Sequence, residues 1–241
     1  MTPVTDHLFT QARTALLARR APLRLVIFDC DGVLIDSEAV ASRVVAGALT
    51  DVGWALTPDE SQAIFLGLSL RQMVPMIETR LGRALPPDWT DMLRARMLAA
   101  LAEEAEAMPG AEAMLLATSA LGLPWRVASN SSHEEMGVKF RRTGLHRLMD
   151  GRLHSHRDVA RGKPAPDLFL AAAAAEGVPP ECCVVVEDSL PGIEGGVAAG
   201  MTVLAYAPDG DGTAQRAAGA WPVTTLAHVP LLLRDALRRA A

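Results

Sequence analysis

The most informative stretch of this chain is an apolar run followed by two carboxylates, Leu23-Arg24-Leu25-Val26-Ile27-Phe28-Asp29-Cys30-Asp31-Gly32-Val33. The run is rich in residues that favour a buried strand. A strand that ends in paired carboxylates places negative charge at the carboxyl edge of a sheet, where open α/β sheets bind ligands. Two such neighbouring charges repel unless a cation lies between them, and Mg²⁺ is the natural complement. The stretch therefore predicts a catalytic site with a divalent cation.

Length and composition limit the kinds of protein that this chain can be. Its 241 residues are 50 % hydrophobic and 21 % charged, which is enough for a large core. The net charge of −5 argues against a nucleic-acid-binding surface, and no apolar stretch approaches the length of a membrane span. The three cysteines offer no disulfide framework and no metal-binding spacing, so a cytoplasmic location is expected. The segment before residue 23 lacks a signal-peptide core and predicts a short extra helix.

The segment from residue 37 to residue 106 contains helical patterns and no convincing strand. The spacing of apolar residues predicts helices over Glu38–Asp51, Ser69–Leu81 and Asp88–Ala107. Another helix begins at Pro58, with Thr57 placed as its N-cap. We therefore predict a compact helical insert at this place in the chain.

Beyond Gly110 the pattern changes to alternating helices and strands. Strands are predicted at Trp125–Ala128, Cys182–Val186 and Thr202–Tyr206. Residues 151–162 read as a loop, in which His154 and His156 are solvated side chains rather than a metal pair. Strands that alternate with helices imply a parallel sheet with helices on both faces. The predicted fold class is α/β, with a Rossmann-like core formed by residues 1–36 and 107–241.

Polar side chains follow three of the predicted strands. They are Asp29 and Asp31 after the first strand, Ser129 and Asn130 after the second, and Glu187 and Asp188 after the third. A lone lysine, Lys163, precedes Pro164 in a loop. Because the carboxyl ends of parallel strands lie at one edge of a sheet, these residues can converge although they are far apart in sequence.

Together these residues offer what phosphoryl transfer needs: a nucleophile, charge neutralisation and in-line placement. A carboxylate nucleophile forms an aspartyl-phosphate and splits a difficult hydrolysis into two easier steps. Mg²⁺ would bridge that carboxylate, a phosphate oxygen, Glu187 and Asp188. Ser129 and nearby backbone N–H groups would hold another phosphate oxygen, while Lys163 would supply a fixed positive charge. Asp31 would give a proton to the leaving oxygen and later take one from water.

Four motifs in this order resemble the haloacid dehalogenase (HAD) superfamily. They read Phe28-Asp29-Cys30-Asp31-Gly32-Val33, Ala128-Ser129-Asn130-Ser131, Gly162-Lys163-Pro164-Ala165-Pro166-Asp167 and Val186-Glu187-Asp188-Ser189-Leu190-Pro191-Gly192. The resemblance covers about Leu23 to Tyr206, and it makes residues 37–106 the inserted α-helical cap of a HAD fold. It implies that Asp29 is the nucleophile and Asp31 the acid/base. It also implies that Asp29, the backbone carbonyl of Asp31 and Asp188 bind Mg²⁺, with Glu187 alongside.

Within the superfamily, the chain is most similar to the β-phosphoglucomutase and sugar-phosphatase branch. Residues 36–43, Asp-Ser-Glu-Ala-Val-Ala-Ser-Arg, resemble the bacterial 6-phosphogluconate phosphatases of that branch. Mutases of the branch carry a cap histidine twelve residues after the nucleophile, and this chain has Ala41 there, which favours water as the final acceptor. The cap loop over residues 67–71 often meets the substrate in this branch, so Ser69 and Arg71 are candidates for specificity.

The resemblance thus implies a Mg²⁺-dependent phosphatase of small phosphorylated metabolites, such as sugar or sugar-acid phosphates, and a monomer. Its partner would be a small phosphate ester, with no nucleic acid and no membrane. A phosphomutase is the first alternative, against which Ala41 argues. A haloacid dehalogenase is the second, and it needs neither Mg²⁺ nor the carboxylates of Asp31, Glu187 and Asp188. A non-catalytic interaction protein would not require the complete set of catalytic groups. The natural substrate stays open, because cap residues set that choice.

Overall fold

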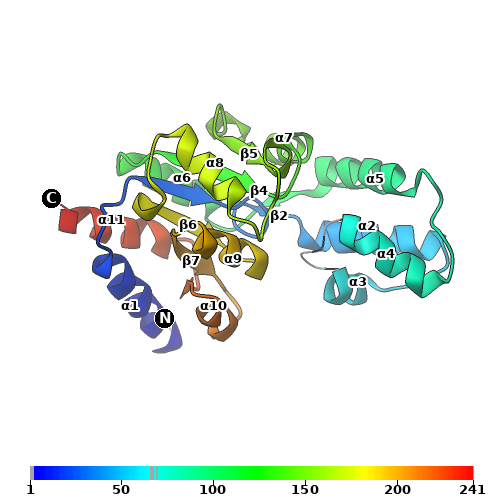
Figure 1. Ribbon diagram of the computed structural model, residues 1–241, viewed down its shortest axis with the longest axis horizontal. Helices are drawn as coiled ribbons and strands as arrows, with labels where there is room; N and C mark the ends of the chain where they lie inside the picture. Colours follow the sequence, from blue (N-terminus) through cyan, green and yellow to red (C-terminus); the bar gives the residue numbers. More distant parts are fainter. Residues whose placement is uncertain (1–2, 66–67, 69, 241) are drawn as a thin grey trace.

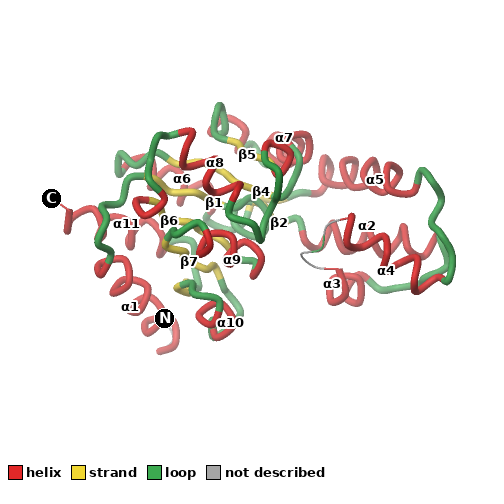
Figure 2. Tube along the Cα trace, in the orientation of Figure 1, coloured by secondary structure: helices red, strands yellow, loops and turns green. Residues whose placement is uncertain are grey.

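A six-stranded parallel sheet forms the centre of the structure, a computed structural model that describes residues 3–65, 68 and 70–240. The strand order is β5-β4-β1-β6-β7-β8. The order from β5 to β7 can be followed in Figures 1 and 2. The strands are β1 (Leu25–Phe28), β4 (Trp125–Ser129), β5 (Leu153–Ser155), β6 (Cys183–Glu187), β7 (Thr202–Tyr206) and β8 (Trp221–Val223). Because β1 lies between β4 and β6, the carboxyl ends of three strands meet at one edge. The prediction of an α/β fold with a Rossmann-like parallel sheet is confirmed.

Helices cover both faces of this sheet. They are α1 (Pro3–Ala18), α6 (Ala111–Ala120), α7 (His133–Arg142), α8 (Asp167–Ala175), α9 (Leu190–Ala198), α10 (Thr213–Ala217) and α11 (His228–Ala240). In β1, Val26 and Phe28 belong to the apolar cluster that includes α6 and α11. Leu25 and Ile27 point the other way, into the cluster that includes α8 and α9. Burial on both faces explains why the central strands read as continuous apolar runs.

Four further helices stand beside the sheet, on the right in Figure 1. They are α2 (Glu38–Asp51), α3 (Pro58–Phe65), α4 (Leu70–Leu81) and α5 (Trp89–Glu104). Two short antiparallel strands, β2 (Ile35–Asp36) and β3 (Glu106–Ala107), join them to the rest of the chain. The helix predicted over Asp88–Ala107 therefore ends earlier, at Glu104, because Glu106–Ala107 pair with β2. Thr57 caps α3 as expected: its Oγ1 accepts from the Glu60 N–H at 3.2 Å, and Glu60 accepts from the Thr57 N–H at 2.8 Å.

Helix α1 is the extra helix that the sequence predicts, and it packs against α11 and β8. At its end, Arg19 donates to the carbonyls of Cys183 at 2.9 Å and Glu181 at 2.8 Å. These bonds tie the N-terminal segment to the beginning of β6. No described helix, α1 included, has the length and apolar character needed to cross a bilayer.

Two edge strands, β5 and β8, were not predicted from the sequence. Each has only three residues, so neither shows enough alternation of apolar and polar positions to be recognised, and each forms by pairing with a longer neighbour. Pro222 is tolerated in β8 because it lies on an edge strand. The interpretation of His154 and His156 as solvated loop residues is wrong: His154 lies in β5, and both side chains are half-buried.

Candidate active site

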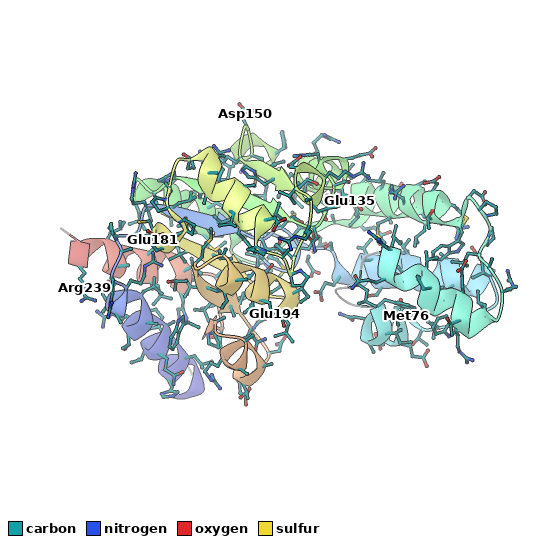
Figure 3. The ribbon with its side chains drawn as sticks, in the orientation of Figure 1. Met76, Glu135, Asp150, Glu181, Glu194 and Arg239 are labelled. Carbon is teal, nitrogen blue, oxygen red and sulfur yellow. The ribbon has the colours of Figure 1, made fainter. Side chains whose placement is uncertain are left out.

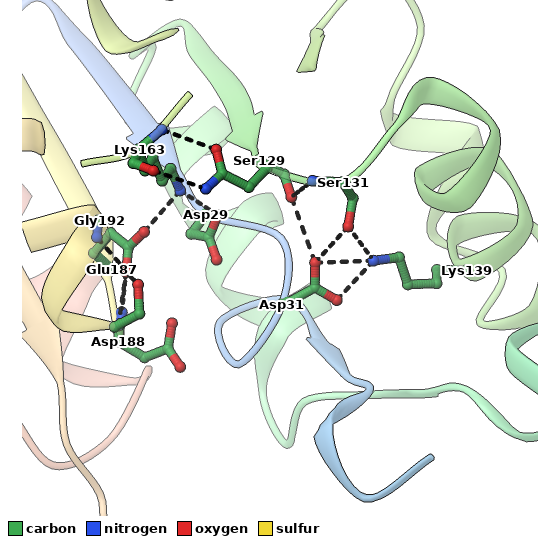
Figure 4. Close-up of polar contacts among 11 residues, drawn as sticks. Asp29, Asp31, Ser129, Ser131, Lys139, Lys163, Glu187, Asp188 and Gly192 are labelled. Carbon is green, nitrogen blue, oxygen red and sulfur yellow. Dashed lines mark hydrogen bonds and ion pairs between the residues drawn. The ribbon is translucent and has the colours of Figure 1, made fainter. Parts of the chain in front are cut away.

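The carboxyl edge of the sheet brings together side chains from β1, from β6 and from the loop before α8 (Figure 4). Asp29 follows β1, and its backbone N–H donates to the Val186 carbonyl at 2.9 Å, which places it beside the end of β6. Glu187 is the last residue of β6, and Lys163 reaches both carboxylates from its loop. The exposed fractions of the Asp29, Glu187 and Lys163 side chains are 9 %, 0 % and 4 %. Water is therefore almost excluded from this cluster.

Lys163 is the cation of the cluster. Its Nζ forms a short ion pair with Asp29 Oδ1 and lies 2.7 Å from Glu187 Oε1. Asn130 holds the backbone of this lysine, since its Oδ1 accepts from the Lys163 N–H at 2.9 Å and its Nδ2 donates to the Lys163 carbonyl at 3.1 Å. Burial alone would lower the pKa of the ammonium, but the charges and hydrogen bonds of Asp29 and Glu187 together raise it. Lys163 is consequently a fixed positive charge.

Asp29, Glu187 and Asp188 form an acidic group that fits a divalent cation. One carboxylate oxygen from each lies within 4.8 Å of the others, and Mg²⁺ prefers such oxygen ligands. The buried Oδ1 of Asp188 has no hydrogen-bond partner, although buried polar atoms normally have one. At Gly32, whose φ is +75°, a Cβ would overlap the Asp188 carboxylate, so only glycine leaves room for it. The donor set, the unpaired oxygen and the glycine all suit a metal site.

The Asp31 side chain points away from this acidic group, toward α7 (Figure 4). Lys139 Nζ lies 2.6 Å from its Oδ1 and 2.9 Å from its Oδ2. Ser131 donates to Oδ2 at 2.9 Å, and Ser37 donates a short hydrogen bond to Oδ1. Burial alone would raise the pKa of Asp31, but the Lys139 charge and these hydrogen bonds together lower it. These contacts therefore favour the carboxylate form of Asp31.

Lys139 is a residue of this site that sequence reasoning missed. In the sequence it belongs to a polar helix that starts near His133, where a lysine suggests a solvated face. A signal was nevertheless present, because Met136, Lys139 and Phe140 are spaced as an apolar stripe of a helix, and all three are buried on α7. A lysine on such a stripe needs a buried anion, and Asp31 is that anion.

A model of the family described as haloacid dehalogenase-like hydrolase matches residues 23–200, a span that contains every carboxylate of this site. The chain belongs to this family. The resemblance inferred from the four motifs is thus confirmed, and the HAD fold explains why the motifs meet at one sheet edge although they are scattered along the chain.

Relatives of this HAD hydrolase carry the names of phosphatases. The 6-phosphogluconate phosphatase of Escherichia coli (strain K12) is 32 % identical over 188 residues, which cover 78 % of this chain and 84 % of that protein. Hexitol phosphatase A of the same organism is 32 % identical over 184 residues, covering 74 % and 81 %. A HAD family hydrolase from Deinococcus radiodurans R1, solved with bound phosphate and sodium, is 34 % identical with a TM-score of 0.74, covering 90 % and 97 %. The expectation of a phosphoric monoester hydrolase agrees with these relatives.

In this HAD hydrolase, burial, and after it the crowding of carboxylates, raises the pKa values of Asp29 and Asp188. Burial raises the pKa of Asp29 to about 7, with Lys163 opposing the shift and Glu187 adding to it. Burial, followed by the charges of Glu187 and Asp29, raises the pKa of Asp188 to about 9. A divalent cation beside these groups would favour their ionised forms and remove the strain of their mutual repulsion.

We expect the affinity of this acidic group for a divalent cation to rise between about pH 6 and pH 9, because protons compete with the metal for Asp29 and Asp188. Both carboxyls have a folded-state pKa above their unfolded value of 3.8. Without metal, the unfolded chain releases these protons first, so the free energy of unfolding falls as the pH rises from about 4 to about 9. Isothermal titration calorimetry in buffers of different ionisation enthalpy measures both the affinity and the proton release. Equal affinities at the two ends of the range would contradict this expectation.

The predicted phosphate and specificity residues of the HAD hydrolase lie in different environments. Ser129 is buried at the end of β4, where its Oγ accepts from the Ser131 N–H at 3.0 Å. The Asn130 amide is occupied by the Lys163 backbone, so a contact between Asn130 and phosphate stays a prediction. Arg71 is exposed on α4, and Ser69 lies outside the described residues. The specificity roles of these two residues likewise stay predictions.

Proposed function

We propose that this protein is a Mg²⁺-dependent phosphatase of small phosphorylated metabolites, such as sugar or sugar-acid phosphates, and that it acts through an aspartyl-phosphate on Asp29. The observation that carries the proposal is the buried ion pair between Asp29 and Lys163, which lies beside the carboxylates of Glu187 and Asp188. The relatives named 6-phosphogluconate phosphatase and hexitol phosphatase A support the substrate class. A monomeric state and a cytoplasmic location belong to the same proposal.

In the first half-reaction, a carboxylate oxygen of Asp29 attacks phosphorus while the bond from phosphorus to the ester oxygen breaks. Asp31 in its protonated form gives its proton to the departing oxygen, which leaves as an alcohol, and Asp31 returns to the carboxylate form that its contacts with Lys139 favour. Lys163 balances charge on Asp29 and on the phosphate, and Ser129 with nearby backbone N–H groups binds a phosphate oxygen. Asp29, Glu187, Asp188 and the Asp31 carbonyl would hold Mg²⁺, which supplies charge neutralisation for the phosphate when it is bound.

In the second half-reaction, water attacks the phosphorus of the aspartyl-phosphate and the bond between phosphorus and Asp29 breaks. Asp31 takes a proton from the attacking water, and inorganic phosphate leaves. The water proton thus restores the one that Asp31 gave to the alcohol, and Asp29 is again a carboxylate. Both half-reactions depend on where the Asp31 carboxyl group points.

Residues 37–106 are proposed to act as a cap over a core formed by residues 1–36 and 107–241. The arrangement of α2 to α5 beside the sheet supports this division, and hinges are proposed near residues 33–36 and 108–110 (Figure 1). A cavity of about 240 Å³ lies between these helices and the beginning of α7. Its lining is largely apolar and includes the charged side chains of Arg94 and of Glu135, which is labelled in Figure 3. Closure of such a cap excludes water and leaves the choice of substrate to cap residues.

A phosphate-release screen over phosphorylated metabolites, with and without Mg²⁺, tests the proposed function. We expect Mg²⁺-dependent release of phosphate with a preference among sugar and sugar-acid phosphates. A tenfold preference in kcat/KM corresponds to only about 1.4 kcal/mol, which one or two cap contacts could supply. β-Glucose 1-phosphate with a trace of its bisphosphate is included in the panel. Its conversion to glucose 6-phosphate without free phosphate would overturn the proposal in favour of a mutase, an outcome against which Ala41 argues.

A further inference from the structure

A buried lysine lies outside the acidic group and outside the four sequence motifs. Lys139 in α7 has 2 % of its side chain exposed. Its Nζ lies 2.6 Å and 2.9 Å from the two carboxylate oxygens of Asp31 and 2.8 Å from Ser131 Oγ. An ammonium has three N–H donors, and these three contacts provide an acceptor for each. All three N–H donors of the Lys139 ammonium are thus used by Asp31 and Ser131.

The contacts of Lys139 determine the direction of the Asp31 carboxylate. Oδ1 receives hydrogen bonds from Lys139 and Ser37, while Oδ2 receives them from Lys139, from Ser131 and, at 3.4 Å, from Ser129. Lys139 is the one group among these partners that binds both oxygens. As a result the carboxylate faces α7 and lies apart from Asp29 and Asp188 (Figure 4).

Helix α7 does not need this lysine for its own stability. A capping box formed by Ser132 and Glu135 begins the helix, and Met136 and Phe140 bury its apolar face. An ammonium buried between such side chains is costly unless it is paired, whereas an apolar side chain of similar length would fill the same space without that cost. A lysine at this position is therefore better explained by its ion pair with Asp31 than by packing in the core.

We propose that Lys139 is the positioning residue of Asp31, holding both oxygens of its carboxyl group in the orientation from which its two proton transfers start. The proposal rests on the phosphatase function proposed above. It assigns no contact between Lys139 and the substrate. Loss of the lysine frees the Asp31 carboxylate to rotate, while the Asp29–Lys163 pair and the acidic group keep their own contacts.

Two kinetic constants report the two proton transfers separately. kcat/KM reports the steps up to departure of the alcohol, in which Asp31 protonates the leaving oxygen. A good leaving group departs without that proton, so kcat/KM depends on Asp31 only for poor leaving groups. For a good leaving group, we expect kcat to be limited by hydrolysis of the aspartyl-phosphate, in which Asp31 takes the proton from water. 4-Nitrophenyl phosphate has a good leaving group, and benzyl phosphate has a poor one.

In Lys139→Met we expect kcat/KM for benzyl phosphate to fall about tenfold or more, while kcat/KM for 4-nitrophenyl phosphate changes by about twofold or less. With 4-nitrophenyl phosphate, kcat falls and KM falls in proportion, and stopped-flow traces show a burst of nitrophenol stoichiometric with enzyme. Lys139→Arg keeps a cation at the position and restores part of the loss. Ser131→Ala removes one of the three Lys139 contacts together with the hydrogen bond from Ser131 to Asp31 Oδ2, and we expect it to shift the same constants in the same direction by a smaller factor.

Arg142→Met is the matched control, because it removes a cation from the same helix. Arg142 is exposed and donates to the Glu103 carbonyl at 2.8 Å, away from Asp31. Its kinetic constants with both substrates should equal those of the unmodified protein. Thermal unfolding of all variants shows which of them fold. If Lys139→Met does not fold, the two single variants Ser131→Ala and Lys139→Arg test the proposal instead.

Equal losses of kcat/KM for both substrates without a burst would overturn the proposal, because they would make Lys139 a purely structural residue. Unchanged constants in Lys139→Met would also overturn it. Failure of the proposed function looks different, since the unmodified protein with Mg²⁺ would then release phosphate from neither substrate.

Discussion

Asp29→Asn is expected to lower kcat for phosphate release by about 1,000-fold or more, because an amide cannot attack phosphorus as a carboxylate does. The fold should survive the change. Burial and the charge of Glu187 raise the pKa of Asp29, so removal of its charge also relieves repulsion within the acidic group. Steady-state phosphate release measures the loss, and quenched reactions with hydroxylamine detect the aspartyl-phosphate in the unmodified protein and its absence in the variant.

Asp235→Asn is the matched control for this change. Asp235 lies on α11 and accepts from Arg13 of α1 at 2.6 Å, outside the site. An exposed pair of this kind contributes at most about 1 kcal/mol to stability, so both activity and unfolding temperature should stay close to those of the unmodified protein. Phosphatase activity retained in Asp29→Asn would refute the nucleophile assignment, whatever the result with Asp235→Asn.

Removal of divalent metal should lower phosphatase activity about 1,000-fold or more, since a bound metal supplies several kcal/mol of charge stabilisation and each 1.36 kcal/mol changes a rate tenfold. The three carboxylates of Asp29, Glu187 and Asp188 lie close together and have one cationic side chain, Lys163, in direct contact with two of them. Without metal, this negative charge would meet the phosphate dianion directly. Phosphate release after treatment with EDTA, followed by addition of Mg²⁺, measures the loss and its recovery.

EDTA already saturated with Mg²⁺ serves as the control, because it adds the chelator without removing metal. It should leave the activity unchanged. Parallel assays with a haloacid substrate separate the two chemistries of this family. Dehalogenation that persists in EDTA, together with phosphate release that is absent in Mg²⁺, would show that the carboxylates do not hold a catalytic metal and that the protein is a dehalogenase.

Much of the fold could be predicted because each element carried its own signal. The run before Asp29 is continuously apolar, as a strand buried on both faces must be, and the helices over 37–106 repeat apolar residues at helical spacing. The short edge strands β5 and β8 could not be predicted, because three residues carry too little pattern and form only against a neighbouring strand.

In the candidate site, too, the residues at strand ends could be predicted from the sequence, whereas contacts made by loop packing could not. Asp29, Ser129 and Glu187 stand at the ends of strands, so the order of motifs was sufficient to place them at one edge of a parallel sheet. The contact between the Asn130 side chain and the Lys163 backbone could not be predicted from the order of motifs. This side chain holds the Lys163 backbone across 33 residues of sequence, a contact that depends on how the loop packs.

By itself, the sequence determined the family of this protein and the groups of its candidate site: a HAD hydrolase with a lysine and an acidic group at the carboxyl edge of a parallel sheet. It could do so because strand ends and their polar residues are local features. Only the tertiary structure decided where the second aspartate points. Asp31 meets Lys139 across 108 residues of sequence because the fold places the buried side of α7 beside the turn that follows β1. A local sequence pattern cannot indicate a contact between residues so far apart in the chain.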